Sequence, residues 1–173
     1  MVEMHLADVR VSLPTQVPVV LLQEAGGARR ILYIFIGNPE ADAIVKAMRG
    51  SVPPRPLTHD LFRDVVEALG ATVERIVVTE LRLDEANNGT FYAELHLAVG
   101  DQHHVVSARP SDAIALAART GSPIFASDSL LDAEGKAPEE EEVEGEGDGE
   151  DAQQLVEKFH DFIEGIRPED FAS

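Results

Sequence analysis

The fold is decided by one stretch of the chain, Arg109-Pro-Ser-Asp-Ala-Ile-Ala-Leu-Ala-Ala-Arg119. It follows an apolar, strand-like run at 104–108 and predicts a helix that stops at Gly121. Pro110 suits the first helical position, where a missing N–H costs no hydrogen bond. Ser111 and Asp112 place oxygen acceptors beside the free N–H groups of the first turn. The alanines make this helix slim, so other elements can pack closely, and its polar end either anchors a core or builds a site.

The composition predicts one globular domain with a core and an appendage. The chain has 173 residues, 44% of them hydrophobic, and no cysteine. The absence of cysteine excludes disulfides and thiolate metal sites. No apolar run approaches the roughly 18 residues of a membrane span, and the N-terminus lacks a signal pattern. We therefore expect a cytoplasmic protein with no membrane contact.

The net charge of −18 is concentrated at the C-terminus. Residues 139–173 carry 14 of the 32 acidic side chains but only 2 of the 14 basic ones. The composition predicts a disordered acidic linker at 137–152, then an amphipathic helix and tail at 153–173. The helix, 153–166, either docks on the domain or binds a protein partner. The folded domain, 1–136, is mildly acidic and lacks the basic surface typical of proteins that hold nucleic acid by charge alone.

Residue patterns over 1–136 predict a compact α+β domain with mixed, mostly antiparallel sheets and packed helices. The runs 17–23 and 31–36 flank a Gly-Gly turn and predict a hairpin. The second run is apolar throughout, which predicts a central strand. A three-stranded meander is expected over 72–83, 91–99 and 103–108. Helices are predicted near 38–49 and 59–69, capped by Asn38 and Thr58, and the second has an apolar stripe formed by Leu61, Phe62, Val65, Val66 and Leu69.

Two of the predicted helices share a sequence pattern. Residues 42–49 match 112–119 at five of eight positions, and each segment follows an apolar strand and precedes a glycine. The match indicates either a duplicated strand–helix unit or a coincidence of residues that are common in helices. A duplication would produce two related halves with a crevice between them.

Three segments carry a family resemblance: Ile36-Gly-Asn-Pro-Glu-Ala41, Pro54-Arg-Pro-Leu-Thr-His-Asp-Leu61 and Ala108-Arg-Pro-Ser-Asp-Ala-Ile-Ala-Leu-Ala117. Gly89-Thr-Phe-Tyr-Ala93 lies between the last two. In this order and spacing, the segments resemble the bifunctional nuclease domain family over about residues 4–133. The resemblance implies a compact α+β fold, a homodimer, and cleavage of both RNA and DNA.

One position departs from the family pattern. Relatives often have an acidic residue two positions before the arginine of Arg-Pro-Ser-Asp, whereas this chain has Ser107. If that acid binds metal in relatives, this chain lacks one ligand.

The candidate site residues lie at or near the predicted helix starts, which favour anions. Phosphodiester hydrolysis needs an activated water and stabilisation of charge on the phosphate. Arg55 and Arg109 could bind the phosphate, with Ser111 as a further substrate contact, and His59 could act as the base. A divalent metal, Mg²⁺ or Mn²⁺, is the expected cofactor, and its candidate ligands are carboxylates: Glu40, Asp60 and Asp112.

Each candidate also has a purely structural interpretation. Asp60 and Asp112 can simply stabilise helix starts, and the arginines can tie loops to carbonyl groups or to Asp112 itself. Two functional hypotheses therefore stand. One is a metal-assisted nuclease of low sequence specificity. The other is a non-catalytic dimeric module whose tethered C-terminal helix recruits a partner protein.

Overall fold

The computed structural model describes residues 1–12 and 15–138, and within them it has seven strands and four helices. The strands are β1 (Val2–Val11), β2 (Pro18–Glu24), β3 (Ile31–Phe35), β4 (Ala71–Leu83), β5 (Gly89–Val99), β6 (Gln102–Ala108) and β7 (Ile124–Ala126). The helices are α1 (Asn38–Met48), α2 (Thr58–Ala68), α3 (Pro110–Thr120) and α4 (Asp128–Glu134). The predicted terminal helix, and the predicted linker from residue 139 onward, lie outside the described residues.

All seven strands form one mixed sheet in the order β3-β2-β1-β7-β4-β5-β6. Five of the neighbouring pairs are antiparallel, and only β4 and β7 run parallel. The predicted β2–β3 hairpin and the β4–β5–β6 meander are both present. The structure therefore confirms the α+β class with a mostly antiparallel sheet.

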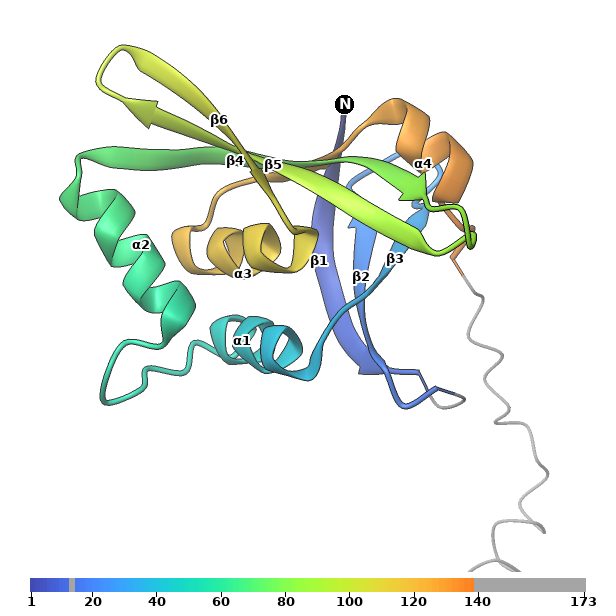
Figure 1. Ribbon diagram of the computed structural model, residues 1–173, viewed down its shortest axis with the longest axis horizontal. Helices are drawn as coiled ribbons and strands as arrows, with labels where there is room; N and C mark the ends of the chain where they lie inside the picture. Colours follow the sequence, from blue (N-terminus) through green and yellow to red (C-terminus); the bar gives the residue numbers. More distant parts are fainter. Residues whose placement is uncertain (13–14, 139–173) are drawn as a thin grey trace, which may run out of the picture. The chain divides into compact units, whose positions relative to one another are not determined.

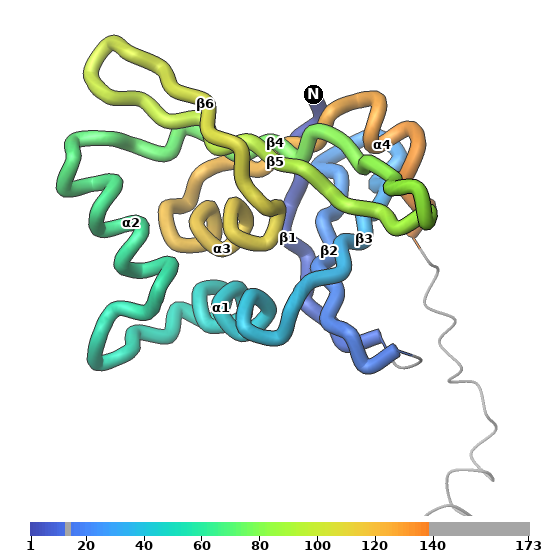
Figure 2. Tube along the Cα trace, viewed as in Figure 1, coloured from blue at the N-terminus to red at the C-terminus, as the bar shows by residue number. Residues whose placement is uncertain are grey.

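The topology repeats one unit. Strands β1, β2 and β3 form an antiparallel meander that leads into α1, and strands β4, β5 and β6 form another that leads into α3. The short strand β7 pairs with both β1 and β4 and so joins the two halves into one sheet. Figure 2 follows the chain from β3 into α1 and from β6 into α3, and the two helices lie side by side.

The prediction that 31–36 forms a central strand is wrong. Strand β3 lies at one edge of the sheet. Leu32 and Ile34 are fully buried, but Phe35 is 60% exposed. Side chains of a strand alternate between its two faces, so the apolar run supplies one core face and leaves an aromatic side chain on the other.

Helix α3 lies at the centre of the core. It packs against α1, α2, β4 and β5, and Figure 1 shows it between the strands and α1. Residues 113–117 are buried, as their small side chains permit. Arg109 precedes the helix in an extended conformation and Pro110 occupies its first turn. The helix ends at Gly121, whose φ of 71° is left-handed backbone that glycine adopts without strain.

Two predicted helix caps are wrong by one residue. Gly37 and Leu57 occupy the cap positions of α1 and α2, and Asn38 and Thr58 are the first helical residues. In α2 the cap function comes from within the helix, because Asp60 Oδ2 accepts a hydrogen bond from the Leu57 backbone N–H at 2.9 Å.

The apolar stripe of α2 faces away from the core over most of its length. Only Val66 is buried, and the others remain exposed: Leu61, Phe62, Val65 and Leu69. In the described part of the chain, no helix has the length and apolar character needed to cross a membrane.

Candidate functional site

The first turns of three helices line a polar pocket of about 340 Å³. Glu40 comes from α1, Thr58 and His59 from α2, and Asp112 from α3. Arg109 joins them from the position just before α3. A helix start presents free N–H groups and a partial positive charge, so three of them around one pocket favour a bound anion.

Arg109 holds two carboxylates of this pocket together. Its Nε and Nη2 atoms donate to both oxygens of Asp112, at 2.7 and 3.0 Å. The same Nη2 atom lies 3.0 Å from Glu40 Oε1. The Arg109 side chain is nevertheless 65% exposed, so one side of the guanidinium faces solvent and can meet a ligand.

Gly37 makes room for this arrangement. A Cβ atom at position 37 would collide with the Glu40 carboxylate. The glycine of the Ile36–Ala41 segment therefore lets Glu40 fold back over the start of α1 and reach Arg109.

His59 forms a dyad with Asp112. Its Nε2 atom lies 3.2 Å from Asp112 Oδ1, and the imidazole side chain is 14% exposed. The two residues are 53 positions apart in the sequence. When Nε2 carries the proton of this hydrogen bond, the lone pair of the neutral ring is on Nδ1.

Asp60 takes part in a different set of contacts. Its Oδ1 accepts a hydrogen bond from Arg119 Nε at 2.6 Å, while its Oδ2 accepts the Leu57 N–H. Arg119 also donates to the backbone carbonyls of Ala115 and Ala43. This arginine thus ties α3 to α1 and α2. The structure does not bring Asp60 into the polar pocket.

The remaining candidates are dispersed. Arg55 is exposed and, among the described residues, has neither a hydrogen bond nor an ion pair. Ser111 is buried and lines a second pocket instead. Ser107 lies on β6 opposite Glu94 of β5 and lines neither of these two pockets.

The ion pairs set the charge of the carboxylates. Burial raises the pKa of Asp112, but hydrogen bonds and charge from Arg109 and His59 outweigh this, and the pKa is lowered overall. Burial likewise raises the pKa of Asp60, and the hydrogen bonds from Arg119 and the Leu57 N–H lower it further than burial raises it. The pKa of Arg109 is raised, chiefly by its hydrogen bond to Asp112. Both aspartates are therefore anionic at neutral pH.

The donor atoms fit a divalent cation only in part. Within residues 1–12 and 15–138, no three His, Asp or Glu side chains are grouped closely enough to hold a metal. Glu40 Oε1 and Asp112 Oδ1, however, both lie 3.0 Å from the same Arg109 nitrogen, so their oxygens converge on one point. Two carboxylates plus water and a substrate phosphate are a common Mg²⁺ environment. Asp60 does not fit this pair, because it does not line the polar pocket and its carboxylate pairs with Arg119 instead.

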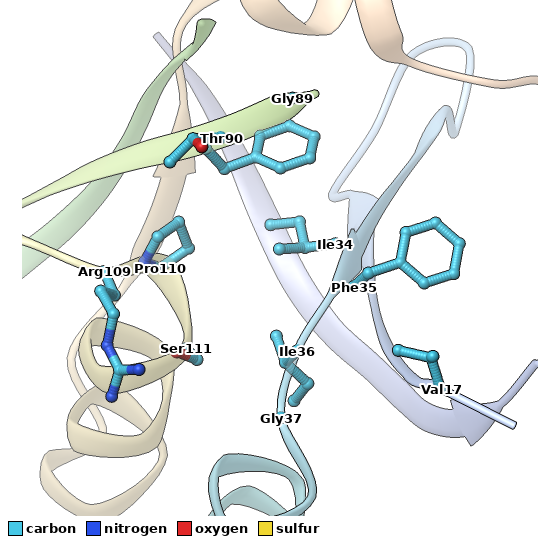
Figure 3. Close-up of a pocket in the computed structure, with 11 residues that line it drawn as sticks. Val17, Ile34, Phe35, Ile36, Gly37, Gly89, Thr90, Arg109, Pro110 and Ser111 are labelled. Atoms are coloured by element: carbon cyan, nitrogen blue, oxygen red, sulfur yellow. The ribbon is translucent and has the colours of Figure 1, made fainter. Parts of the chain in front are cut away.

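A second, mainly apolar pocket of about 380 Å³ lies beside the polar one. Arg109 lines both pockets. Figure 3 shows Arg109, Pro110 and Ser111 on one side of it and Ile34 to Gly37 on the other. The sequence alone did not reveal this pocket. The alternation of side chains along β3 would, however, have placed Phe35 on the outer face of the sheet.

The chain matches the family model for the bifunctional nuclease domain over residues 20–139, more than half of its length. An uncharacterized protein of Mycobacterium tuberculosis is 42% identical over 169 residues, which cover 98% of this chain and 97% of that protein. Bifunctional nuclease 2 of Arabidopsis thaliana is 33% identical over 118 residues, covering 65% of this chain and 34% of the plant protein.

Bifunctional nuclease 1 of Oryza sativa subsp. japonica is 28% identical over 108 residues, which cover 61% of this chain and 31% of the rice protein. The matches thus span about a third of each plant protein. The segments at 36–41, 54–61 and 108–117 supply seven of the nine residues that line the polar pocket, and the other two, Asp42 and Ala43, directly follow the first segment. The chain belongs to the bifunctional nuclease domain family.

Proposed function

We propose that this protein is a nuclease that hydrolyses phosphodiester bonds in RNA and DNA with low sequence specificity, and that the polar pocket is its active site. One observation carries the proposal: the His59–Asp112 dyad and the exposed guanidinium of Arg109 meet at the first turns of three helices. A nuclease needs a base for the attacking water and a positive group for the phosphate, and this pocket offers both.

His59 is the proposed general base. Asp112 accepts the Nε2–H and fixes the ring, which leaves the lone pair of Nδ1 for the proton of the attacking water. The water oxygen then bonds to phosphorus as the bond from phosphorus to the leaving oxygen breaks, and solvent protonates the leaving oxygen. Arg109 is the proposed phosphate ligand, because a guanidinium matches two phosphate oxygens. Arg55, exposed and free of partners among the described residues, is a second phosphate contact for a flanking nucleotide.

Divalent-metal assistance is part of the proposal. Glu40 and Asp112 are the residues that would hold Mg²⁺ or Mn²⁺, because their carboxylates both contact Arg109 and so lie close together. The bound cation would supply Lewis-acid stabilisation of the phosphate charge. Arg109 would then bind the phosphate from the solvent side, which its exposure permits.

The test is cleavage of end-labelled RNA and single-stranded DNA by the full-length protein, with and without chelator. His59→Ala and Asp112→Asn should each lower the rate by about 100-fold, the usual contribution of a general base. Asp64→Asn is the matched control, because Asp64 is an α2 aspartate that pairs only with the neighbouring Arg63 in the described chain. If all four proteins have the same rate, the activity is a contaminant and the proposal is wrong.

A homodimer is also proposed, and the exposed apolar side chains of α2 support it. Leu61, Phe62, Val65 and Leu69 form what we call the α2 stripe, and a stripe of this kind is more typical of an interface than of a surface in water. It is equally the observation that favours the alternative function, a non-catalytic dimeric module. The protein partner for 153–166 and the cytoplasmic location remain predictions from the sequence.

A further inference from the structure

The lining of the apolar pocket is typical of a small-molecule binding site. Most of its lining is apolar or aromatic: Val17, Ile34, Phe35, Ile36, Phe91 and Pro110. Its volume of about 380 Å³ lies within the range of small-molecule pockets, about 300–1,000 Å³. Three separate elements contribute, namely the end of β3, the start of β5 and the start of α3. The pocket is therefore formed only when the two halves of the chain are assembled.

A hydroxyl group inside this wall has no protein partner. Ser111 is 6% exposed, yet its side chain makes no hydrogen bond with any described residue. It lines the pocket, and Figure 3 shows it facing Ile36 and Gly37 across the gap. The hydroxyl oxygen is not among the fully buried side-chain atoms that lack a partner, so it keeps some accessible surface and a ligand that fills this pocket can hydrogen-bond to it. Thr90, on the same lining, adds a second hydroxyl.

The pocket adjoins the proposed phosphate site. Arg109 lines both cavities, and Gly37 of the apolar pocket is two residues from Pro39 of the polar one. A ligand with a phosphate at Arg109 can therefore place its next chemical group in the apolar pocket. In a nucleic acid strand that group is the sugar with its base.

We propose that the apolar pocket binds one unpaired nucleobase of the strand whose phosphate is held by Arg109. This inference rests on the proposed nuclease function. A nucleobase has an apolar face that stacks on aromatic rings and a polar edge that hydrogen-bonds. Phe35, at the exposed edge of the sheet, supplies a ring for the face, and the Ser111 and Thr90 hydroxyls serve the edge. Hydroxyls can donate and accept, so this pocket takes any base, as low sequence specificity requires.

The experiment measures binding of the full-length protein to two fluorescent oligodeoxynucleotides by anisotropy. One is a single strand with ordinary bases, and the other is an abasic strand with the same number of phosphates. The protein carries His59→Ala so that the strands stay intact. We expect the base-containing strand to bind about tenfold more tightly, which is the effect of one base stacked on an aromatic side chain.

Phe35→Leu should remove most of this preference and leave binding of the abasic strand unchanged. Phe35 is largely exposed, so the substitution should not prevent folding. Ser111→Ala should reduce the preference by a smaller factor. Val105→Ala is the control, because Val105 is an exposed apolar residue of β6 that lines neither pocket and lies outside the α2 stripe.

Two results would overturn the base pocket. The two strands could bind equally, or Phe35→Leu could weaken both to the same extent. Either result is compatible with the nuclease proposal, provided that the protein with an intact His59 cleaves nucleic acid and that His59→Ala removes this cleavage. Conversely, the protein could prefer the base-containing strand through Phe35 and yet show no cleavage that depends on His59. This result would support the base pocket and contradict the nuclease activity.

Discussion

Arg119 Nε, in the last turn of α3, donates a hydrogen bond to Asp60 Oδ1, in the first turn of α2, across 2.6 Å. The Arg119 side chain is only 5% exposed, so this ion pair is largely withdrawn from water. Together with the bond from Arg119 to the Ala43 carbonyl, it connects three helices. The contact positions α2, and with it His59, relative to the start of α3.

Asp60→Asn should destabilise the fold by about 3 kcal/mol at pH 7, because it leaves a buried guanidinium without its anion. The pKa of Asp60 is lowered in the folded state. The ion pair therefore contributes fully above the ordinary aspartate pKa, near 4, and its contribution is lost as the pH falls through the lowered folded value. Urea unfolding at a series of pH values measures this.

The difference between wild type and Asp60→Asn should be constant from neutral pH down to about 5 and should shrink below about 4. Asp64→Asn serves as the control on the same helix. A difference that does not shrink in acid would mean that the loss comes from packing rather than from the charge of Asp60.

Arg109→Gln should weaken binding of a single-stranded oligonucleotide and flatten its salt dependence. One lost phosphate contact lowers the slope of log K against log salt concentration by about 0.7 for a single strand. The measurement is a salt titration of binding with proteins that carry His59→Ala. Arg29→Gln, an exposed arginine in the β2–β3 turn, is the control and should leave the slope unchanged. Equal slopes for Arg109→Gln and wild type would show that Arg109 does not contact the phosphate.

The local elements could largely be predicted from the sequence, because they depend on short-range patterns. Pro110 and Gly121 mark the ends of α3, and alternation of apolar residues identifies the β4–β5–β6 meander. The position of β3 at an edge of the sheet could not be predicted, because an apolar run in the sequence contains no information about which strands lie beside it. The outward direction of the α2 stripe could not be predicted either. Helical periodicity shows that one face of the helix is apolar, but not which element packs against that face.

The candidate site could likewise be predicted only where it depends on local sequence patterns. Glu40, His59, Arg109 and Asp112 were candidates because polar residues at helix starts form a recognisable local pattern. Arg109 and Asp112 are only three positions apart, so their pairing is a local contact that the sequence could suggest. The contact of His59 with Asp112 joins residues 53 positions apart and depends on how the helices pack. The pairing of Asp60 with Arg119 rather than with a shared metal is a tertiary contact that no local pattern contains.

Glu40→Gln should weaken the dependence of cleavage on Mg²⁺ or Mn²⁺. Because one of two converging carboxylates is lost, the cation concentration for half-maximal rate should rise about tenfold. Glu67→Gln, on the exposed side of α2, is the matched control. Direct titration of the protein with Mn²⁺ by calorimetry provides a second readout. Unchanged cation dependence in Glu40→Gln would remove Glu40 from the proposed ligands.

Leu61→Asp should convert a dimer into a monomer, because it places a charge within the α2 stripe. Leu61 is largely exposed within one chain, so the change should cost the monomer fold little, whereas burying an unpaired carboxylate in an interface is expensive. Sedimentation equilibrium should report about twice the chain mass of 18.7 kDa for wild type and the single mass for the variant. Leu83→Asp, at the exposed end of β4, should behave as wild type. If the Leu61→Asp protein is still dimeric, the interface lies elsewhere. If the wild type is monomeric, the α2 stripe is not a dimer interface.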